Sequence, residues 1–251
     1  MSILDAMILG IVQGLTEFLP ISSSGHLILA ERILGVDSSN LTFSLTLHLA
    51  TVTALLIAMR KKVWEQIKNP FCKLNGYIVV ATAVTALVAF SIKNFAVESF
   101  DGNLLPVFFL LTAILLVSSG LTKKERQISL ADALIIGFTQ GLAVFPGLSR
   151  SGSTISVARL CGVQKSQATD FSFFISIPVI VVGALLDCMG GGFATVDILT
   201  LFVGFVSAFV SGLFAVKFML KSLTKSFDGF AIYLLILSAF LIINDAWLHI
   251  L

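Results

Sequence analysis

The sequence predicts an all-α polytopic membrane protein with an inverted-topology repeat, and three observations carry this prediction. Hydrophobic residues make up 57% of the 251 residues and charged residues only 12%, whereas soluble domains carry about 25% charged residues. Six apolar stretches have the length needed to cross about 30 Å of hydrocarbon. The two halves of the chain also align with each other at a constant offset. We therefore expect one integral membrane domain over residues 1–251.

Six transmembrane helices are predicted, together with two interrupted segments. The six spans cover residues 43–59, 77–92, 105–121, 171–188, 197–216 and 229–247. Residues 3–35 and 130–162 are also apolar, but Pro, Gly and several Ser interrupt them. Broken backbone is tolerated at membrane depth only where protein or a wet cavity surrounds it. Both segments are therefore expected to be re-entrant helical hairpins.

The basic residues predict the orientation of the chain. Lys and Arg fill the first, third and fifth connections, and the members are Arg60, Lys61, Lys62, Lys68, Lys73, Lys123, Lys124, Arg126, Lys217, Lys221 and Lys225. The positive-inside rule places these connections in the cytoplasm, so both termini are expected outside the plasma membrane. A net charge of +2 gives no reason to expect a nucleic acid as partner.

An internal repeat relates residues 1–122 to residues 130–251. Asp5-Ala6 aligns with Asp132-Ala133, and Gln13-Gly14-Leu15 aligns with Gln140-Gly141-Leu142. Each copy has one hairpin followed by three spans, and this odd number inverts the second copy relative to the first. Asp5 and Asp132, at the start of the two hairpins, are expected to be helix-start acids. The two hairpins are expected to meet near the midplane of the membrane, where the functional site should lie.

The first hairpin offers acidic and imidazole chemistry beside a helix start. Gln13 and Glu17 project from one face of a helix that Pro20 is expected to end near Leu19. The residues after the break are Ser22, Ser23, Ser24, Gly25 and His26. Ser hydroxyls and free N–H groups at such a helix start attract anions.

The second hairpin offers the same start with a cation added. Pro146-Gly147 forms the break, and the residues that follow include Ser149, Arg150, Ser151, Gly152, Ser153 and Thr154. Burying an arginine in a membrane costs on the order of 3 kcal/mol or more without a partner, and its planar fork suits phosphate oxygens. Arg150 therefore predicts an anionic ligand.

The aligned positions that differ divide the chemistry between the hairpins. Glu17, Ser23 and His26 of the first copy stand opposite Val144, Arg150 and Ser153 of the second. A carboxylate and an imidazole suit metal binding, proton transfer or nucleophilic attack, while the arginine holds phosphate. Together they predict a phosphoryl-transfer site.

Plainer interpretations stand beside this one. Ser and Gly in membrane helices often serve close packing, and Glu17 and Arg150 could form a structural ion pair that a ligand bridges. His48, inside the first span, is a candidate to line the cavity, but it is read as a structural residue or as one that supports the site from behind. Asp170 is read as a helix-start acid.

Two motifs resemble a known family. Residues 13–26 read Gln-Gly-Leu-Thr-Glu-Phe-Leu-Pro-Ile-Ser-Ser-Ser-Gly-His, and residues 146–154 read Pro-Gly-Leu-Ser-Arg-Ser-Gly-Ser-Thr. They look like the two signatures of the undecaprenyl-diphosphate phosphatases associated with bacitracin resistance. The resemblance extends through most of the chain.

The resemblance implies hydrolysis of a C55 polyprenyl diphosphate to the monophosphate and inorganic phosphate, which recycles the lipid carrier of cell-wall sugars. By position, Glu17 and Gln13 would belong to a motif that binds Mg²⁺ or Ca²⁺, and Arg150 would hold the diphosphate. The hydroxyls implied to bind phosphate oxygens are those of Ser22, Ser23, Ser24, Ser149, Ser151 and Thr154. His26 would transfer a proton or act as nucleophile, and the family is usually a homodimer.

The chain departs from the family pattern at two positions. Many members carry Glu where this chain has Gln13, which leaves the number and identity of metal ions open, and Asp170 replaces a frequent Glu. Whether water, His26 or a serine attacks the phosphorus is also open. Because inverted repeats with broken helices are typical of transporters, a flippase for polyprenyl phosphate is the alternative function. A channel fits poorly, since rings of charge that would line a pore are absent from the sequence.

Overall fold

The computed structural model describes residues 1–36, 41–98, 104–190, 196–222 and 226–244, with side chains left undescribed at 93–98 and 186–190. Within these ranges the regular structure is helical, apart from one isolated bridge between Arg126 and Val163. The prediction of an all-α fold is confirmed.

The helices of the first half follow the predicted order. α1 (Ile3–Phe18) and α2 (Ser23–Leu34) form the first hairpin, and the spans correspond to α3 (Leu41–Ala58), α5 (Lys73–Glu98) and α6 (Leu105–Gly120). A short helix that was not predicted, α4 (Arg60–Lys68), occupies the first basic connection.

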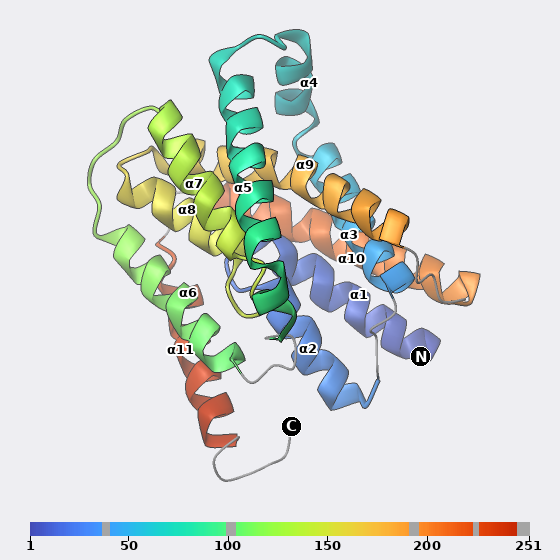
Figure 1. Ribbon diagram of the computed structural model, residues 1–251. Coiled ribbons are helices and arrows are strands. Elements are labelled where there is room, and N and C mark those ends of the chain that lie inside the picture. Colours follow the sequence, from blue (N-terminus) through green and yellow to red (C-terminus); the bar gives the residue numbers. More distant parts are fainter. Residues whose placement is uncertain (37–40, 99–103, 191–195, 223–225, 245–251) are drawn as a thin grey trace.

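The helices described in the second half follow the same order. α7 (Leu130–Leu142) and α8 (Arg150–Leu160) form the second hairpin, and the helices α9 (Lys165–Gly190), α10 (Ile198–Lys221) and α11 (Asp228–Ile243) follow. α7 packs beside α5, and α1 packs beside α10 (Figure 1). The last predicted span, 229–247, ends beyond residue 244 and so lies partly outside the described residues.

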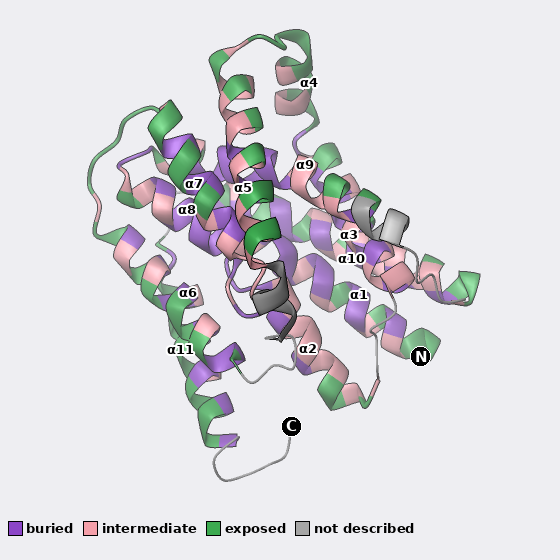
Figure 2. Cartoon of the chain, viewed as in Figure 1, coloured by how far each residue is buried: buried purple, intermediate pink, exposed green. Residues whose placement is uncertain are grey.

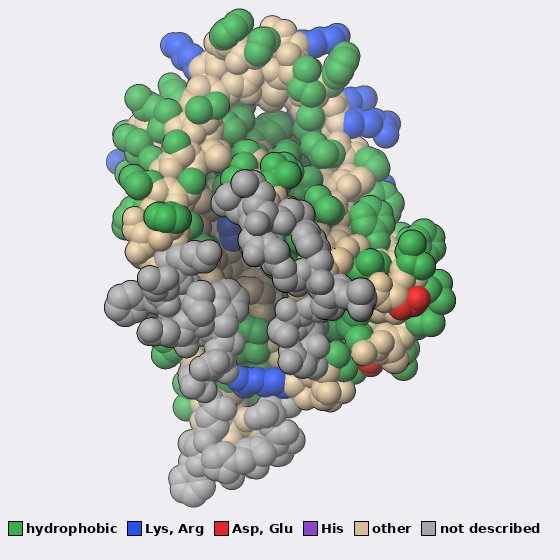
Figure 3. Space-filling view, turned by 45° about the vertical axis from the view of Figure 1, so that its right-hand side comes forward, with side chains coloured by type: hydrophobic (Ala, Val, Ile, Leu, Met, Phe, Trp, Pro, Cys, Tyr) green, Lys and Arg blue, Asp and Glu red, His purple; other side chains and the backbone are tan. Residues whose placement is uncertain are grey.

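Helix length and surface both indicate a polytopic membrane protein. Four helices, α3, α5, α9 and α10, are long and apolar enough to cross a bilayer. Large apolar side chains point outward along these helices, among them Phe90 at 82% exposure and Phe202 at 64%. Figure 2 shows that buried residues concentrate in the interior of the bundle, and Figure 3 shows hydrophobic side chains over much of one face. Such a surface suits lipid and would be a liability in water.

The two hairpins begin with the same hydrogen-bonded cap. Ser2 Oγ accepts from Asp5 N at 3.2 Å, and Asp5 Oδ2 accepts from Ser2 N at 2.7 Å. Ser129 and Asp132 repeat this reciprocal pair at 3.4 and 2.8 Å. Each carboxylate therefore satisfies backbone donors at a helix start, which confirms the prediction for both acids.

Asp170 does not have the predicted place at a helix start. α9 begins at Lys165, so Asp170 lies beyond its first turn. Its carboxylate instead forms an ion pair with Lys62 at 2.5 Å, joining α9 to α4. The expectation for this residue was wrong because the helix extends further toward its N-terminus than the apolar run indicated.

The first helix of each hairpin packs against the second long helix of the other half. A Cβ on Gly10 of α1 would lie 2.6 Å from Gly204 O and 3.2 Å from Ala208 N in α10. A Cβ on Gly137 of α7 would lie 2.5 Å from Ala81 O in α5. Only glycine allows this approach of two backbones, and the two halves are therefore interleaved.

Candidate functional site

The breaks of the two hairpins are in direct contact. Ser22 is the N-cap of α2, and its Oγ accepts from the backbone N–H of Gly147 in the other break at 3.1 Å. Ser151, in the first turn of α8, donates through Oγ to Leu19 O at 2.9 Å. The N-termini of α2 and α8 therefore begin beside one another.

Two residues in the breaks have left-handed backbone. Gly147 has φ +93°, which glycine adopts without cost, whereas Ser22 has φ 72° and carries a side chain. A non-glycine residue in this region costs on the order of 1–2 kcal/mol, and such strain is concentrated at functional sites. Here the hydroxyl of Ser22 joins the two breaks, and the hydrogen bond that it accepts offsets the cost of the strained backbone.

A cavity of about 170 Å³ lies between the breaks. Its lining from the first hairpin is Thr16, Glu17, Ser22, Ser23 and Ser24, and its lining from the second is Ala143, Val144, Leu148, Ser149 and Arg150. His48 of α3 completes the wall. The cavity has room for a phosphate group but not for a C55 chain, so a prenyl tail would remain outside it.

Glu17 is buried and surrounded by donors. Its Oε1 accepts from Arg150 Nη2, so an ion pair joins the two hairpins. Its Oε2 accepts from Ser23 Oγ at 2.6 Å and from Gln13 Nε2 at 3.0 Å. The plainer interpretation of Glu17 and Arg150 as an ion pair is thus part of the structure, and it holds both groups at the cavity wall.

Arg150 retains donor capacity that the protein does not use. Its Nη1 is buried and has no hydrogen-bond partner among the described residues, although the residue lines the cavity. An unpaired buried donor costs about 1–3 kcal/mol, more when it is charged. An anion in the cavity would supply the missing acceptor.

The predicted phosphate-binding hydroxyls fall into two groups. Ser22, Ser23, Ser24 and Ser149 line the cavity, whereas Ser151 and Thr154 do not. Thr154 Oγ1 donates to Arg150 O at 2.8 Å and is 2.6 Å from Ser172 Oγ. The structure therefore places Ser151 and Thr154 in the scaffold behind the cavity.

His26 also lies away from the cavity. Its Nδ1 is 2.7 Å from Ser22 O, and because a carbonyl only accepts, Nδ1 carries the proton. Its Nε2 then accepts from the hydroxyl of Tyr233 in α11 at 2.7 Å, and the two rings are stacked. Tyr233 was not singled out from the sequence, where nothing connects it to residue 26.

His48 is closer to the polar groups of the site than the sequence analysis indicated. Its Nδ1 lies 3.1 Å from Gln13 Nε2 and 4.0 Å from Glu17 Oε2. The apolar neighbours of His48 in the sequence indicated a lipid-spanning helix and gave no sign of this contact. A signal was nonetheless available, since a polar residue inside a span is a candidate functional residue.

Comparison with known proteins assigns this chain to a family. The sequence model of the family described as bacitracin resistance protein BacA matches residues 6–240. The chain belongs to the BacA family. A relative from Carboxydothermus hydrogenoformans named undecaprenyl-diphosphatase is 39% identical, with 98% of each chain covered. One of the same name from Bacteroides thetaiotaomicron is 41% identical over 98% of this chain and 100% of its own, and one from Korarchaeum cryptofilum is 37% identical over 90% and 92%.

Few side chains of this BacA-family chain could hold a divalent cation at the site. The described residues contain no cluster of three His, Cys, Asp or Glu side chains able to hold a metal. Gln13 Oε1, however, is buried without a partner beside Glu17. Mg²⁺ commonly takes one or two carboxylates and completes its shell with water and substrate phosphates. Glu17 lines the cavity and fits such a cation, with most of its ligands coming from outside the protein, whereas Gln13 is fully buried, does not line the cavity and offers its unpaired oxygen from behind Glu17.

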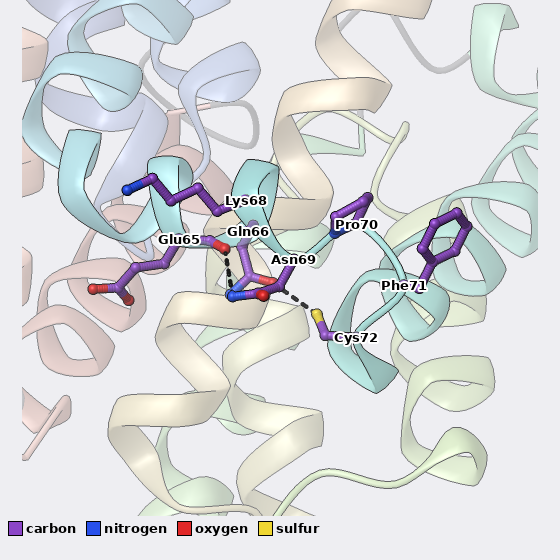
Figure 4. A pocket seen from close by; sticks show the side chains of 7 residues that line it. All are labelled: Glu65, Gln66, Lys68, Asn69, Pro70, Phe71 and Cys72. Carbon is purple, nitrogen blue, oxygen red and sulfur yellow. Dashed lines mark hydrogen bonds between the residues drawn. The ribbon is translucent and has the colours of Figure 1, made fainter.

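A larger surface hollow in this BacA-family chain, of about 730 Å³, lies at the turn from α4 to α5 (Figure 4). Its lining includes one acid, Glu65, and one base, Lys68, and Phe71 beside them is fully exposed. Cys72 Sγ donates to Gln66 Oε1 at 3.2 Å across it. None of the predicted site residues lines this hollow, so size alone does not mark the functional site.

Proposed function

We propose that the chain hydrolyses undecaprenyl diphosphate to undecaprenyl monophosphate and inorganic phosphate, recycling the lipid carrier of cell-wall sugars. One observation carries this proposal: a single cavity holds an arginine with an unused donor beside a serine that donates to a carboxylate. Relatives that match almost the whole chain are named undecaprenyl-diphosphatases, which supports the same substrate.

Arg150 and the helix starts provide the phosphate-binding part of this proposal. The guanidinium donates charge-assisted hydrogen bonds to the terminal phosphate, using the free Nη1. The N-terminal N–H groups of α2 and α8 add partial positive charge from two sides. Phosphoryl transfer depends mainly on positioning and on neutralising oxygen charge, and these groups supply both.

Ser23 is our choice for the attacking group. Its hydroxyl donates to Glu17 Oε2 at 2.6 Å and faces the cavity, while both ring nitrogens of His26 are engaged elsewhere. Glu17 accepts the proton as the Ser23 Oγ–P bond forms and the P–O bond to the polyprenyl monophosphate breaks. Water then attacks the phosphoserine as Glu17 returns its proton to Ser23 Oγ, so that the Oγ–P bond breaks, inorganic phosphate leaves with the proton of the water, and both Ser23 and the Glu17 carboxylate are restored. His26 and Tyr233 position the N-terminus of α2, which carries Ser23.

A divalent cation, Mg²⁺ or Ca²⁺, belongs to the proposal as a partner of Glu17 and Gln13. Bound there together with substrate oxygens, it would neutralise phosphate charge. Gln13 would present Oε1 to it, since Gln13 Nε2 is already committed to Glu17 and His48.

The membrane topology is the remaining part of the proposal. We infer six spans, two re-entrant hairpins of opposite orientation that meet near the midplane, both termini outside the plasma membrane, and a homodimer. The matching caps at Ser2 and Ser129 and the matching glycine contacts of Gly10 and Gly137 support the inverted repeat. α6 and α11 have 16 residues each, or about 24 Å at 1.5 Å per residue, and would cross where the bilayer thins.

Labelling of single cysteines tests the orientation. In a cysteine-free background, Ser2→Cys should react with a membrane-impermeant maleimide added to intact cells, whereas Lys61→Cys and Lys123→Cys should react only after lysis. The reverse pattern would invert the topology. The mass of the detergent-solubilised protein, measured by light scattering, tests the homodimer.

Phosphate release tests the enzymatic proposal against the flippase alternative. Purified protein in detergent with undecaprenyl diphosphate and Mg²⁺ should release inorganic phosphate, and EDTA should suppress the release. Because a pure flippase makes no phosphate, a wild-type protein that is folded and silent would refute hydrolysis. Transport of undecaprenyl phosphate in sided liposomes would then decide for the alternative.

A further inference from the structure

His48 occupies a position in the cavity that the proposed chemistry leaves without a role. It comes from α3 and belongs to neither hairpin. Its side chain is 35% exposed and lines the cavity wall. Because Arg150 approaches Glu17 from the other hairpin, the carboxylate has a cation on one side and this imidazole near the other.

The hydrogen bonds of Gln13 determine which nitrogen of His48 carries the proton. Gln13 Nε2 donates to Glu17 Oε2 at 3.0 Å, and turning the amide over would place Oε1 against the carboxylate. The amide nitrogen therefore also faces His48 Nδ1, 3.1 Å away. An amide nitrogen only donates, so His48 Nδ1 accepts and the ring proton of the neutral imidazole lies on Nε2.

The Nε2–H of His48 is then an unused donor. It has no hydrogen-bond partner among the described residues, and it belongs to a ring in the wall of a cavity that Arg150 also lines. A neutral imidazole with a fixed proton donates to phosphate oxygens without adding to the positive charge of the site. It also cannot bind a metal through the protonated nitrogen.

We propose that His48 is a phosphate-binding residue whose Nε2–H donates to an oxygen of the substrate diphosphate, with Gln13 fixing the ring tautomer. The proposal rests on the proposed function for the identity of the substrate. It assigns Gln13 a second task, because the amide that presents Oε1 to a cation also orients the histidine. His48 thereby adds a contact from the transmembrane bundle to those made by the hairpins.

Two substitutions separate the two ring nitrogens. Asn in place of His48 puts an amide oxygen near the position of Nδ1, where it can accept from Gln13, but its side chain is too short to reach the position of Nε2. Gln in place of His48 extends an amide N–H toward the position of Nε2. The probe is methylenebisphosphonate, a non-hydrolysable diphosphate, and its binding is measured by calorimetry in detergent with EDTA present, so that no metal contributes.

We expect His48→Asn to weaken bisphosphonate binding about tenfold, as for the loss of a hydrogen bond to a charged group, and His48→Gln to remain within about twofold of wild type. In the phosphate-release assay, His48→Asn should raise KM by about the same factor, and it should lower kcat by less. Thr53→Ala is the matched control on α3, because Thr53 Oγ1 only bonds its own helix, at Leu49 O. It should bind like wild type.

Equal bisphosphonate binding by His48→Asn and wild type would overturn the proposal. Weaker binding by His48→Gln than by His48→Asn would also overturn it, since that order means that binding depends on the acceptor at Nδ1 and not on the donor at Nε2. Absence of bisphosphonate binding by the wild type would overturn it as well. Failure of the proposed function would give a different result. The folded protein and its variants would then show the expected order of bisphosphonate binding, but the wild type would release no phosphate from the lipid. Thermal unfolding of each variant confirms that it is folded.

Discussion

The hydroxyl of Ser22 accepts the backbone N–H of Gly147 at 3.1 Å, and through this bond the break of one hairpin caps the break of the other. The same oxygen accepts from Gly25 N at 3.4 Å, at the start of α2. One strained serine, with φ 72°, thus sets both the beginning of a helix and the contact between two halves of the chain.

Substitution of Ser22 should separate its hydrogen bonds from its strain. Ser22→Ala loses both accepted bonds and keeps a Cβ in the left-handed region, whereas Ser22→Gly loses the bonds but relieves the strain. We expect the free energy of unfolding to fall for both, and to fall further for Ala than for Gly by about 1 kcal/mol. Thermal unfolding in detergent measures the order, and a more stable Ala variant would contradict it.

The pair of Arg150 and Glu17 should be required for turnover. Arg150→Ala and Glu17→Ala are each expected to lower phosphate release by at least about 100-fold, the usual cost of removing a donor that stabilises transition-state charge. Arg150→Lys should recover little, because an ammonium cannot contact Glu17 and a phosphate with one planar fork. Near-wild-type release by a folded Ala variant would exclude this site.

Ser23 and Ser24 form a matched pair of neighbouring cavity serines. Ser23 donates to Glu17 at 2.6 Å, while Ser24 Oγ has only a 3.4 Å contact with Ser22 Oγ. If Ser23 is the attacking group, Ser23→Ala should abolish phosphate release, whereas Ser24→Ala should retain it within about tenfold, as for the loss of one neutral hydrogen bond. Similar rates for the two variants would instead favour direct attack by water.

The helix contacts of the hairpins should be equally sensitive in both halves. A Cβ on Gly14 would lie 2.7 Å from Gly212 N, and one on Gly141 would lie 2.5 Å from Val88 Cβ. Gly14→Ala and Gly141→Ala should each destabilise the fold by about 1–3 kcal/mol.

Gly183→Ala is the control for these two variants, since a Cβ there has no neighbour within 4 Å. It should leave stability unchanged or raise it by up to about 1 kcal/mol, because Ala favours a helix over Gly. Thermal unfolding compares the three, and a tolerant Gly14 or Gly141 would argue against the close packing of α1 or α7.

Gln13→Glu should change the demand for a divalent cation. A second carboxylate beside Glu17 adds a charged oxygen ligand, and Mg²⁺ prefers such ligands. We expect the Mg²⁺ concentration that gives half-maximal phosphate release to fall about tenfold, while the maximal rate falls because the amide no longer donates to Glu17 and His48. An unchanged Mg²⁺ dependence would place the cation elsewhere.

Much of the fold was predictable because local rules decide it. The Ser–Asp caps at residues 2–5 and 129–132 and Pro20 determine where the hairpin helices begin and end, and the structure has these boundaries within a residue or two. The polar groups of the cavity were also predictable, since Glu17 and Arg150 had no other reason to lie within apolar segments.

Only the tertiary structure decided which of these side chains share the cavity. His26 follows Ser22 by one helical turn, and the phase of α2 directs its ring to Tyr233 of α11. His48 lies in a helix apolar enough to cross a bilayer, yet the packing of α3 beside α1 brings it to Gln13. The sequence by itself determined the elements and the chemical groups, whereas helix phase and long-range packing, which depend on residues far apart in the chain, determined which groups meet.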